Sequence, residues 1–205
     1  MKRAELLGKI EQKDCITSNH CRKTAYYAMK LGYNMRLNEK EMTALELSAA
    51  LHDIGKINVP DAILLKPNVL TEDEYEIVKR HSIWGAEILE RVFSEQDMDM
   101  KLQKEFERER ICVTKTIRHH HERFDGKGYP DGLKGDKIPV YSQIIAVADA
   151  YDAMTSNRPY RQAMETKNAV DVLRSERGKQ FRPQMIDLFI NSVIPSSFRN
   201  ASFAK

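Results

Sequence analysis

Residues 140–154 form the most apolar helical segment of the chain, yet two aspartates interrupt its apolar face. Ile145, Asp149 and Asp152 recur at helical spacing, so both carboxylates should face the interior beside an isoleucine. An unpaired carboxylate in such a place costs several kcal/mol. The fold must therefore supply metal ions, cationic side chains or hydrogen-bond donors opposite the two acids.

Histidines are the obvious partners, and the chain has 6 of them. Helical periodicity predicts that separate helices carry them. A helix over residues 17–31, closed by Gly32, carries His20. A second helix begins near residue 38, stops at Gly55 and carries His52 and Asp53 on its last turn. A third, from the capping box at residues 71–74 to at least residue 88, carries His81 in its middle. A fourth runs through residues 95–110 and ends in three consecutive histidines, His119, His120 and His121.

Helical signals also dominate the rest of the chain. Only 9 Gly and 7 Pro occur in 205 residues, too few for a β-protein with many turns. Two further helices are predicted at residues 167–176, capped by Thr166, and at 184–193, opened by Pro183. Four glycines cluster in residues 125–135 and predict an irregular loop. The expected fold class is all-α, with one core of ordinary size.

Composition excludes several functions. The 33 Lys and Arg nearly balance the 30 Asp and Glu, which argues against a protein that coats nucleic acid or binds membranes through a polybasic surface. The 3 cysteines show no CxxC spacing, so a disulfide framework and a zinc finger are both unsupported. No stretch reads as a signal peptide or a membrane span. We expect a cytoplasmic protein without a nucleic acid polymer or a membrane as partner.

Imidazole and carboxylate groups without thiolates suit iron, manganese, zinc and similar divalent ions. The candidate ligands are His20, His52, Asp53, His81, His120, His121 and Asp149. Each alone is better explained as a core residue or a helix-end cation, but no simple structural role accounts for all of them together. They exceed the needs of one tetrahedral ion, so two metals are expected. Asp53 could bridge ions roughly 3.5–4 Å apart that share a hydroxide for in-line attack on a phosphate ester.

These residues resemble the HD-GYP family, a branch of the HD metal-dependent phosphohydrolases. The resemblance rests on residues 52–56, which read HDIGK, and residues 120–130, which read HHERFDGKGYP, with support from residues 144–161. It covers about residues 17–190 and implies an HD-domain helical bundle with a glycine-rich GYP loop. The implied division is an N-terminal helical extension at residues 1–16, the HD-GYP phosphohydrolase domain at 17–195 and a tail at 196–205.

The resemblance further implies hydrolysis of cyclic di-GMP to pGpG, and in some members on to GMP, with iron or manganese bound. By their positions in the motifs, His20, His52, Asp53 and Asp149 would bind one metal ion. Asp53, His81, His120 and His121 would bind the other. Asp53 and Lys56 would be catalytic, with Lys56 facing the scissile phosphate, and Arg158 and Arg161 would contact the dinucleotide. Asp152 would orient a ligand, Tyr129 would shape the pocket, and His119 would be a bystander. Ile16 stands where some members have a glutamate for a third metal, so two metals are expected.

Two other functions stay open at this stage. The same metal site could act on another cyclic dinucleotide, such as cyclic GMP-AMP, or on a nucleotide handled by other HD enzymes. A module that senses the dinucleotide or docks to a partner without turnover is the alternative from a different class. Degenerate members usually lose ligands, whereas every ligand position is filled here. A homodimer or a sensory-domain partner is compatible with each function.

Overall fold

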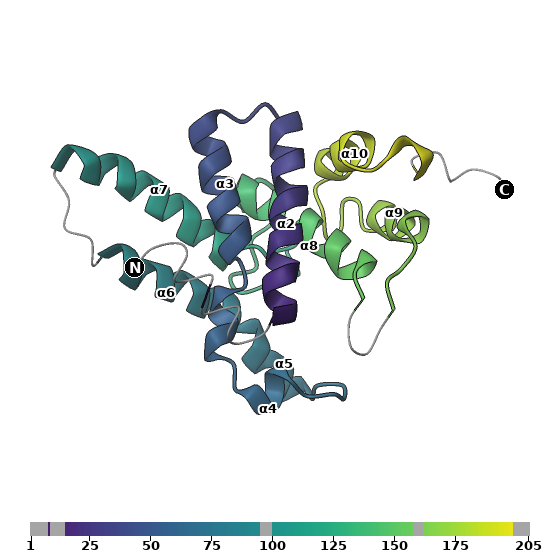
Figure 1. Ribbon diagram of the computed structural model, residues 1–205, viewed down its shortest axis with the longest axis horizontal. Helices are drawn as coiled ribbons and strands as arrows, with labels where there is room; N and C mark the ends of the chain where they lie inside the picture. The colour runs from purple at the N-terminus through teal and green to yellow at the C-terminus, as the bar shows by residue number, and fades with distance from the viewer. Residues whose placement is uncertain (1–7, 9–14, 95–99, 158–161, 199–205) are drawn as a thin grey trace.

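The computed structural model describes residue 8 and residues 15–94, 100–157 and 162–198. Within these ranges the chain is helical, and its only β-type pairing is an isolated bridge between Arg177 and Phe181 (Figure 1). The predicted all-α class is confirmed. Most of the predicted N-terminal extension (residues 1–7 and 9–14) and residues 199–205 of the predicted tail lie outside the described residues, so the predicted domain division stays a prediction.

The core forms around helix α8 (Val140–Thr155), which follows Pro139 as predicted. Ile144, Ile145 and Val147 of this helix are fully buried. Helix α2 (Cys15–Asn34) packs along α8 and also along α3 (Glu39–Leu51), so that α2 crosses the middle of the molecule (Figure 1). The face of α2 that carries His20 is therefore held against the face of α8 that carries the two aspartates.

A second group of helices follows α3 and extends the bundle on its other side (Figure 1). Its members are η1 (Ile54–Asn58), α4 (Asp61–Leu64), α5 (Glu72–Lys79), α6 (His81–Ser94) and α7 (Met100–Arg118). Helix α6 packs against both η1 and α7, and α7 also packs against α3. These contacts bring the end of α3, the start of α6 and the end of α7 to one place.

The C-terminal elements close the opposite side of the core (Figure 1). They are α9 (Thr166–Ser175), α10 (Pro183–Ser192) and η3 (Ser196–Phe198), whereas η2 (Gly135–Lys137) belongs to the segment before α8. Phe189 of α10 packs edge-on against Tyr151 of α8, with ring centroids 5.3 Å apart. Pro183 opens α10 as predicted, but α9 begins at Thr166 itself, and its N-cap Glu165 makes no side-chain capping bond.

The predicted role of Gly32 is wrong, because α2 continues past it to Asn34. Gly32 lies where α3 crosses α2, and a Cβ there would come within 2.6 Å of the Leu45 side chain. The glycine is therefore explained by close helix packing rather than by a helix end.

The long helix predicted from residue 71 is also wrong in one respect, since it divides at Arg80 into α5 and α6. Side chains at the break occupy backbone carbonyls that a continuous helix would use. His81 Nδ1 donates to the Val78 carbonyl at 2.7 Å, and Ser82 Oγ donates to the Lys79 carbonyl at 3.2 Å. His81 consequently begins α6 instead of lying in the middle of a helix. Among the described residues, no helix combines the length and the apolar character that crossing a bilayer requires.

Candidate metal centre

His20 lies between the two aspartates of α8, which gives both the buried Asp152 and the half-buried Asp149 a partner. Its Nε2 is 2.8 Å from Asp149 Oδ1, and its Nδ1 is 2.6 Å from Asp152 Oδ2. Ser156 Oγ donates to the other oxygen of Asp152 at 2.8 Å. Burial opposes the charged imidazole, but hydrogen bonds to both aspartates outweigh it and raise the pKa of His20 to about 9.

The predicted helix end at Gly55 is wrong, because α3 ends at Leu51 and His52 is its C-cap. The His52 side chain is fully buried. Its Nδ1 donates to the Ala49 carbonyl at 2.8 Å, so the proton of the neutral ring resides on Nδ1. The buried Nε2 has no hydrogen-bond partner among the described residues. A buried lone pair of this kind fits a metal ion, because leaving it unpaired costs free energy.

Asp53 lies in the turn after His52, with one carboxylate oxygen toward His52 and the other toward His81. Its Oδ2 is 3.5 Å from His52 Nε2, and its Oδ1 is 3.4 Å from His81 Nε2. Lys56 Nζ lies 2.6 Å from Oδ2. Burial alone would raise the pKa of Asp53, but the Lys56 ammonium and the imidazoles around the carboxylate hold it well below its usual value.

Gly55 explains how this turn can lie so close to α6. A Cβ at Gly55 would be 1.9 Å from the carbonyl oxygen of His81 and 2.5 Å from the backbone nitrogen of Gly85. Only glycine allows two backbones to approach in this way. The glycine of the HDIGK sequence therefore sets the distance between Asp53 and His81.

His81, His120 and His121 form the second half of the cluster, where α6 begins and α7 ends. The Nδ1 atoms of His81 and His120 donate to the carbonyls of Val78 at 2.7 Å and Ile117 at 2.6 Å. Both neutral rings therefore present Nε2 lone pairs, and these two atoms lie only 3.3 Å apart. Neither atom can donate to the other, so a cation between them fits the arrangement.

Burial is the main reason that these three imidazoles stay neutral. It lowers the pKa of His81 to about 4 and of His121 to about 3, and it takes His120 well below its usual value. Neutral imidazole is the form that binds metal ions. His121 Nε2 also lies 3.1 Å from His81 Nε2, which places all three rings around one point.

The structure gathers all seven predicted metal ligands into one continuous cluster. Ligand atoms of His81, His120 and His121 lie within 4.8 Å of one another, as do those of His20, His52 and Asp53. Asp149 joins through its contact with His20. The donor set is nitrogen and oxygen only, which fits divalent transition metals. The predicted dinucleotide contacts, Arg158 and Arg161, lie outside the described residues.

The glycine-rich loop covers one face of the cluster. The Tyr129 ring stacks on the His121 ring with centroids 4.8 Å apart and planes at 28°. Gly128 allows the loop to fold back, because a Cβ there would be 2.3 Å from the Arg123 backbone nitrogen. The predicted role of Tyr129 in shaping the pocket thus has a geometric basis.

Glu122 anchors this loop, and sequence reasoning assigned it no role. Its side chain is buried, and its two oxygens accept the backbone N–H groups of Asp131 at 2.8 Å and Leu133 at 2.9 Å. The available signal was an acidic residue directly before a glycine-rich segment, whose backbone donors need acceptors.

His119 points away from the cluster, in agreement with its expected bystander role. Its Nε2 lies 2.8 Å from Asp131 Oδ2, and Arg118 donates to both oxygens of the same carboxylate at 2.8 Å. His119, Glu122 and Asp131 are close enough to suggest a further metal group. The arginine fork and the loop N–H groups already occupy these oxygens, so the three residues form a structural network.

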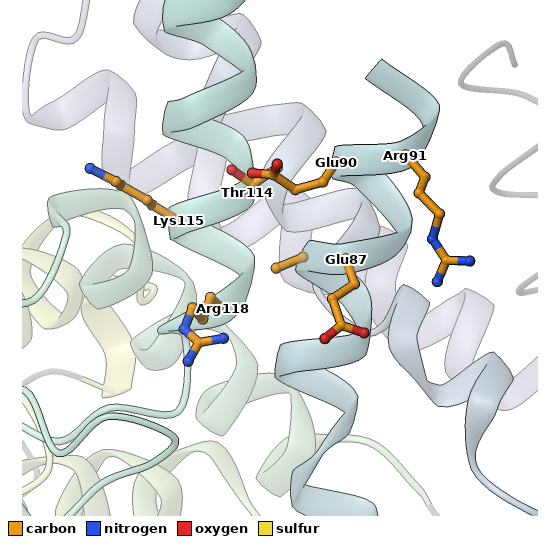
Figure 2. A pocket seen from close by; sticks show the side chains of 7 residues that line it. Glu87, Glu90, Arg91, Thr114, Lys115 and Arg118 are labelled. Carbon is orange, nitrogen blue, oxygen red and sulfur yellow. The ribbon is translucent and has the colours of Figure 1, made fainter. Parts of the chain in front are cut away.

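A surface groove of about 520 Å³ lies elsewhere, between α6 and α7. Figure 2 shows Arg91 and Lys115 projecting outward on opposite sides of this helix pair. The groove is lined by Ala86, Glu87, Glu90, Arg91, Thr114, Lys115 and Arg118. None of the seven clustered histidines and aspartates lines it, so the chemistry is assigned to the cluster.

Comparisons with known proteins agree with this geometry. A family model described as HD domain matches residues 8–185. The cyclic di-GMP phosphodiesterase response regulator RpfG of Xanthomonas campestris pv. campestris is 39% identical over 91% of this chain and 46% of its own length. The 3'3'-cGAMP-specific phosphodiesterase 2 of Vibrio cholerae is 34% identical over 90% of this chain and 33% of its own length. The chain thus spans less than half the length of these curated relatives.

One solved structure supports the fold independently. The HD domain of the L. monocytogenes phosphodiesterase PgpH, solved in complex with cyclic-di-AMP, superposes with a TM-score of 0.63. The alignment covers 92% of this chain and 93% of that one at 18% sequence identity. At that identity the likeness establishes the shared helical architecture.

Proposed function

Because the chain belongs to the HD domain family, we propose that it is a metal-dependent phosphodiesterase that hydrolyses cyclic di-GMP to pGpG, and further to GMP where the linear product rebinds. The observation that carries the proposal is the facing pair of Nε2 lone pairs on His81 and His120, beside the buried carboxylate of Asp53. The relative RpfG, named as a cyclic di-GMP phosphodiesterase, supports the substrate.

The proposed ligand sets follow the two halves of the cluster. His20, His52, Asp53 and Asp149 would hold one ion, and Asp53, His81, His120 and His121 the other. We assign iron or manganese, because imidazole and carboxylate donors suit these ions. When bound, two such ions supply an activated water molecule and stabilise the charge that develops on the phosphate.

The protein's own residues orient the ligands and place charge near the phosphate. Asp152 holds Nδ1 of His20, and a metal ion would replace the Nε2 proton that faces Asp149. Lys56 holds one oxygen of Asp53 at 2.6 Å and puts a positive charge beside the position of a phosphate oxygen. The Tyr129 ring stacks on His121 and limits the orientations open to that imidazole.

Metal analysis and product identification test this proposal directly. Protein purified without oxygen should contain two iron or manganese ions and convert cyclic di-GMP to pGpG. Asp53→Ala should abolish both metal binding and turnover, because it removes the carboxylate common to both sets. Asp187→Ala is the matched control, since it removes only a surface ion pair with Arg177 and should keep both properties. Two bound ions without hydrolysis would contradict the catalytic proposal.

A second candidate keeps the metal centre and changes the substrate to another cyclic dinucleotide, such as cyclic GMP-AMP. The Vibrio cholerae relative named as 3'3'-cGAMP-specific supports it. Parallel measurement of kcat/KM for the two dinucleotides decides between them. A module that only senses or docks would instead keep its partner when Asp53→Ala removes the metal.

We also infer that the protein acts in the cytoplasm. Cys21 and Cys112 are free thiols, which suits a reducing compartment. A sensory-domain partner or a second copy of the chain belongs to the same proposal, because the similar protein RpfG is named as a response regulator. Size-exclusion chromatography with light scattering tests the homodimer.

A further inference from the structure

The rim of the metal centre carries a lysine that the function described so far does not use. Lys79 Nζ lies 5.5 Å from the centroid of the Tyr129 ring, which itself stacks on His121. The same ammonium lies 5.3 Å from the centroid of the Tyr75 ring. Two aromatic rings therefore hold a cation beside the histidine cluster.

The backbone fixes this lysine relative to the cluster. Lys79 is the last residue of α5, and His81 is the first residue of α6. The carbonyl of Val78 accepts the bond from His81 Nδ1, and the carbonyl of Lys79 accepts one from Ser82. Any shift of the Lys79 backbone would therefore disturb a proposed metal ligand, so its side chain starts from a defined position.

The charge of Lys79 is available to a ligand. Its ion-pair partner Glu76 lies 2.5 Å away on the same helix, and that side chain is 60% exposed. Exposed ion pairs of this kind contribute little free energy, so replacing Glu76 by an anionic group of a ligand costs little. Lys56 differs, because its partner Asp53 is buried within the cluster.

Tyr75 adds a free aromatic surface next to the lysine. Its side chain is 49% exposed, although its ring contacts the Lys79 ammonium. Exposed rings beside a cation suit a ligand that combines purines with phosphates, because bases stack on aromatic faces and phosphates bind ammonium groups.

We propose that Lys79 binds the second, uncleaved phosphodiester of a cyclic dinucleotide, and that Tyr75 provides the stacking face for the adjacent purine. This inference rests on the proposed function. A cyclic dinucleotide carries two phosphodiesters, and only one can lie at the metal centre. The other needs a cation at the rim, which Lys79 supplies.

The test replaces the charge while keeping a side chain of similar length. Lys79→Met is compared with Lys79→Arg, which keeps the charge. A second control is Lys66→Met, which removes a lysine charge that pairs with Glu74 of α5, the helix that also carries Lys79. Affinity is measured with a bisphosphorothioate analogue of cyclic di-GMP on metal-loaded protein. Hydrolysis is measured with cyclic di-GMP and with bis(p-nitrophenyl) phosphate, which has a single phosphodiester.

We expect Lys79→Met to raise both the analogue Kd and the KM for cyclic di-GMP about tenfold or more, as the loss of a charge-assisted bond predicts. Its kcat should stay within about twofold of the wild type, as should its hydrolysis of the single phosphodiester. The analogue Kd of Lys79→Arg and of Lys66→Met should stay within about threefold of the wild-type value. Tyr75→Leu should also weaken the analogue, because it removes the stacking face.

Failure of this inference can be told apart from failure of the proposed function. If metal-loaded wild-type protein leaves cyclic di-GMP intact, the proposed function fails, and the subsite is then judged by analogue affinity alone. The inference is overturned if the wild type does not bind the analogue or if Lys79→Met leaves its Kd unchanged. It is also overturned if Lys66→Met raises the analogue Kd as much as Lys79→Met does. The same holds if Lys79→Met slows hydrolysis of bis(p-nitrophenyl) phosphate as much as hydrolysis of cyclic di-GMP.

Discussion

The anchor of the glycine-rich loop offers a sharp test of how the site is built. Glu122 is only 3% exposed, and each of its oxygens accepts one backbone N–H from the loop, at 2.8 Å and 2.9 Å. In Glu122→Gln the amide oxygen can keep one of these bonds, while the amide NH2 group faces the other N–H. Donor meets donor at that position, so the change removes a bond and adds a repulsive contact.

The free energy of unfolding should fall by about 3 kcal/mol. A hydrogen bond to a charged group contributes about 1.5–3 kcal/mol, and a buried unpaired group costs about 1–3 kcal/mol. Asp131 is exposed and Leu133 half-buried, so water can reach the freed donor and the lower part of the combined range applies. For a domain of this size, each kcal/mol lowers Tm by about 2–4 °C, so we expect about 6–12 °C.

Thermal unfolding followed by far-UV circular dichroism measures this change. Glu87→Gln is the matched control, because Glu87 is exposed on α6 and its loss of charge should change stability by less than about 0.5 kcal/mol. Hydrogen exchange over residues 123–135 should accelerate only in Glu122→Gln, since the loop loses its attachment. A Tm for Glu122→Gln within about 2 °C of the wild type would refute the proposed anchor.

Two further predictions concern the backbone and the surface network. Gly55→Ala should destabilise the protein by about 3 kcal/mol or more and weaken metal binding, because the new Cβ meets the His81 carbonyl at 1.9 Å. Gly85→Ala should cost less in the same unfolding and metal titrations, because its new Cβ comes no closer than 3.0 Å to any neighbour, the Ile117 side chain. Bonds from Arg118 lower the pKa of Asp131 to about 2, so this carboxylate stabilises the fold above about pH 4, and that contribution disappears as the pH falls toward 2. The gap in Tm between wild type and Asp131→Asn should therefore be larger at pH 6 than at pH 2.5, and an equal or wider gap at pH 2.5 would contradict the assignment.

Helical periodicity predicted the part of the site that depends on which face of a helix is buried. It placed His20 on the inner face of α2 and Asp149 and Asp152 on the inner face of α8, and the structure brings these side chains together. The prediction worked because a carboxylate on an apolar face needs a partner, and few residues could provide one.

Other features were not predictable, because they arise where segments meet. The break at Arg80 depends on a bond between His81 and the Val78 carbonyl, and a helical pattern does not reveal such competition. Gly32 was read as a helix end, although it serves a close helix crossing. Local signals for these two uses of glycine are the same.

Residue pattern alone thus established an all-helical chain with a histidine and aspartate cluster, and the resemblance of its motifs established the HD family. The tertiary structure decided how those residues meet: which lone pairs face each other, how closely η1 approaches α6 and which acid holds the loop. Periodicity predicts which face of a helix is buried, and that face is determined by the sequence of the helix itself. Distances between ligands, and the cation that Lys79 adds at the rim, are properties of packed segments and follow only from the fold.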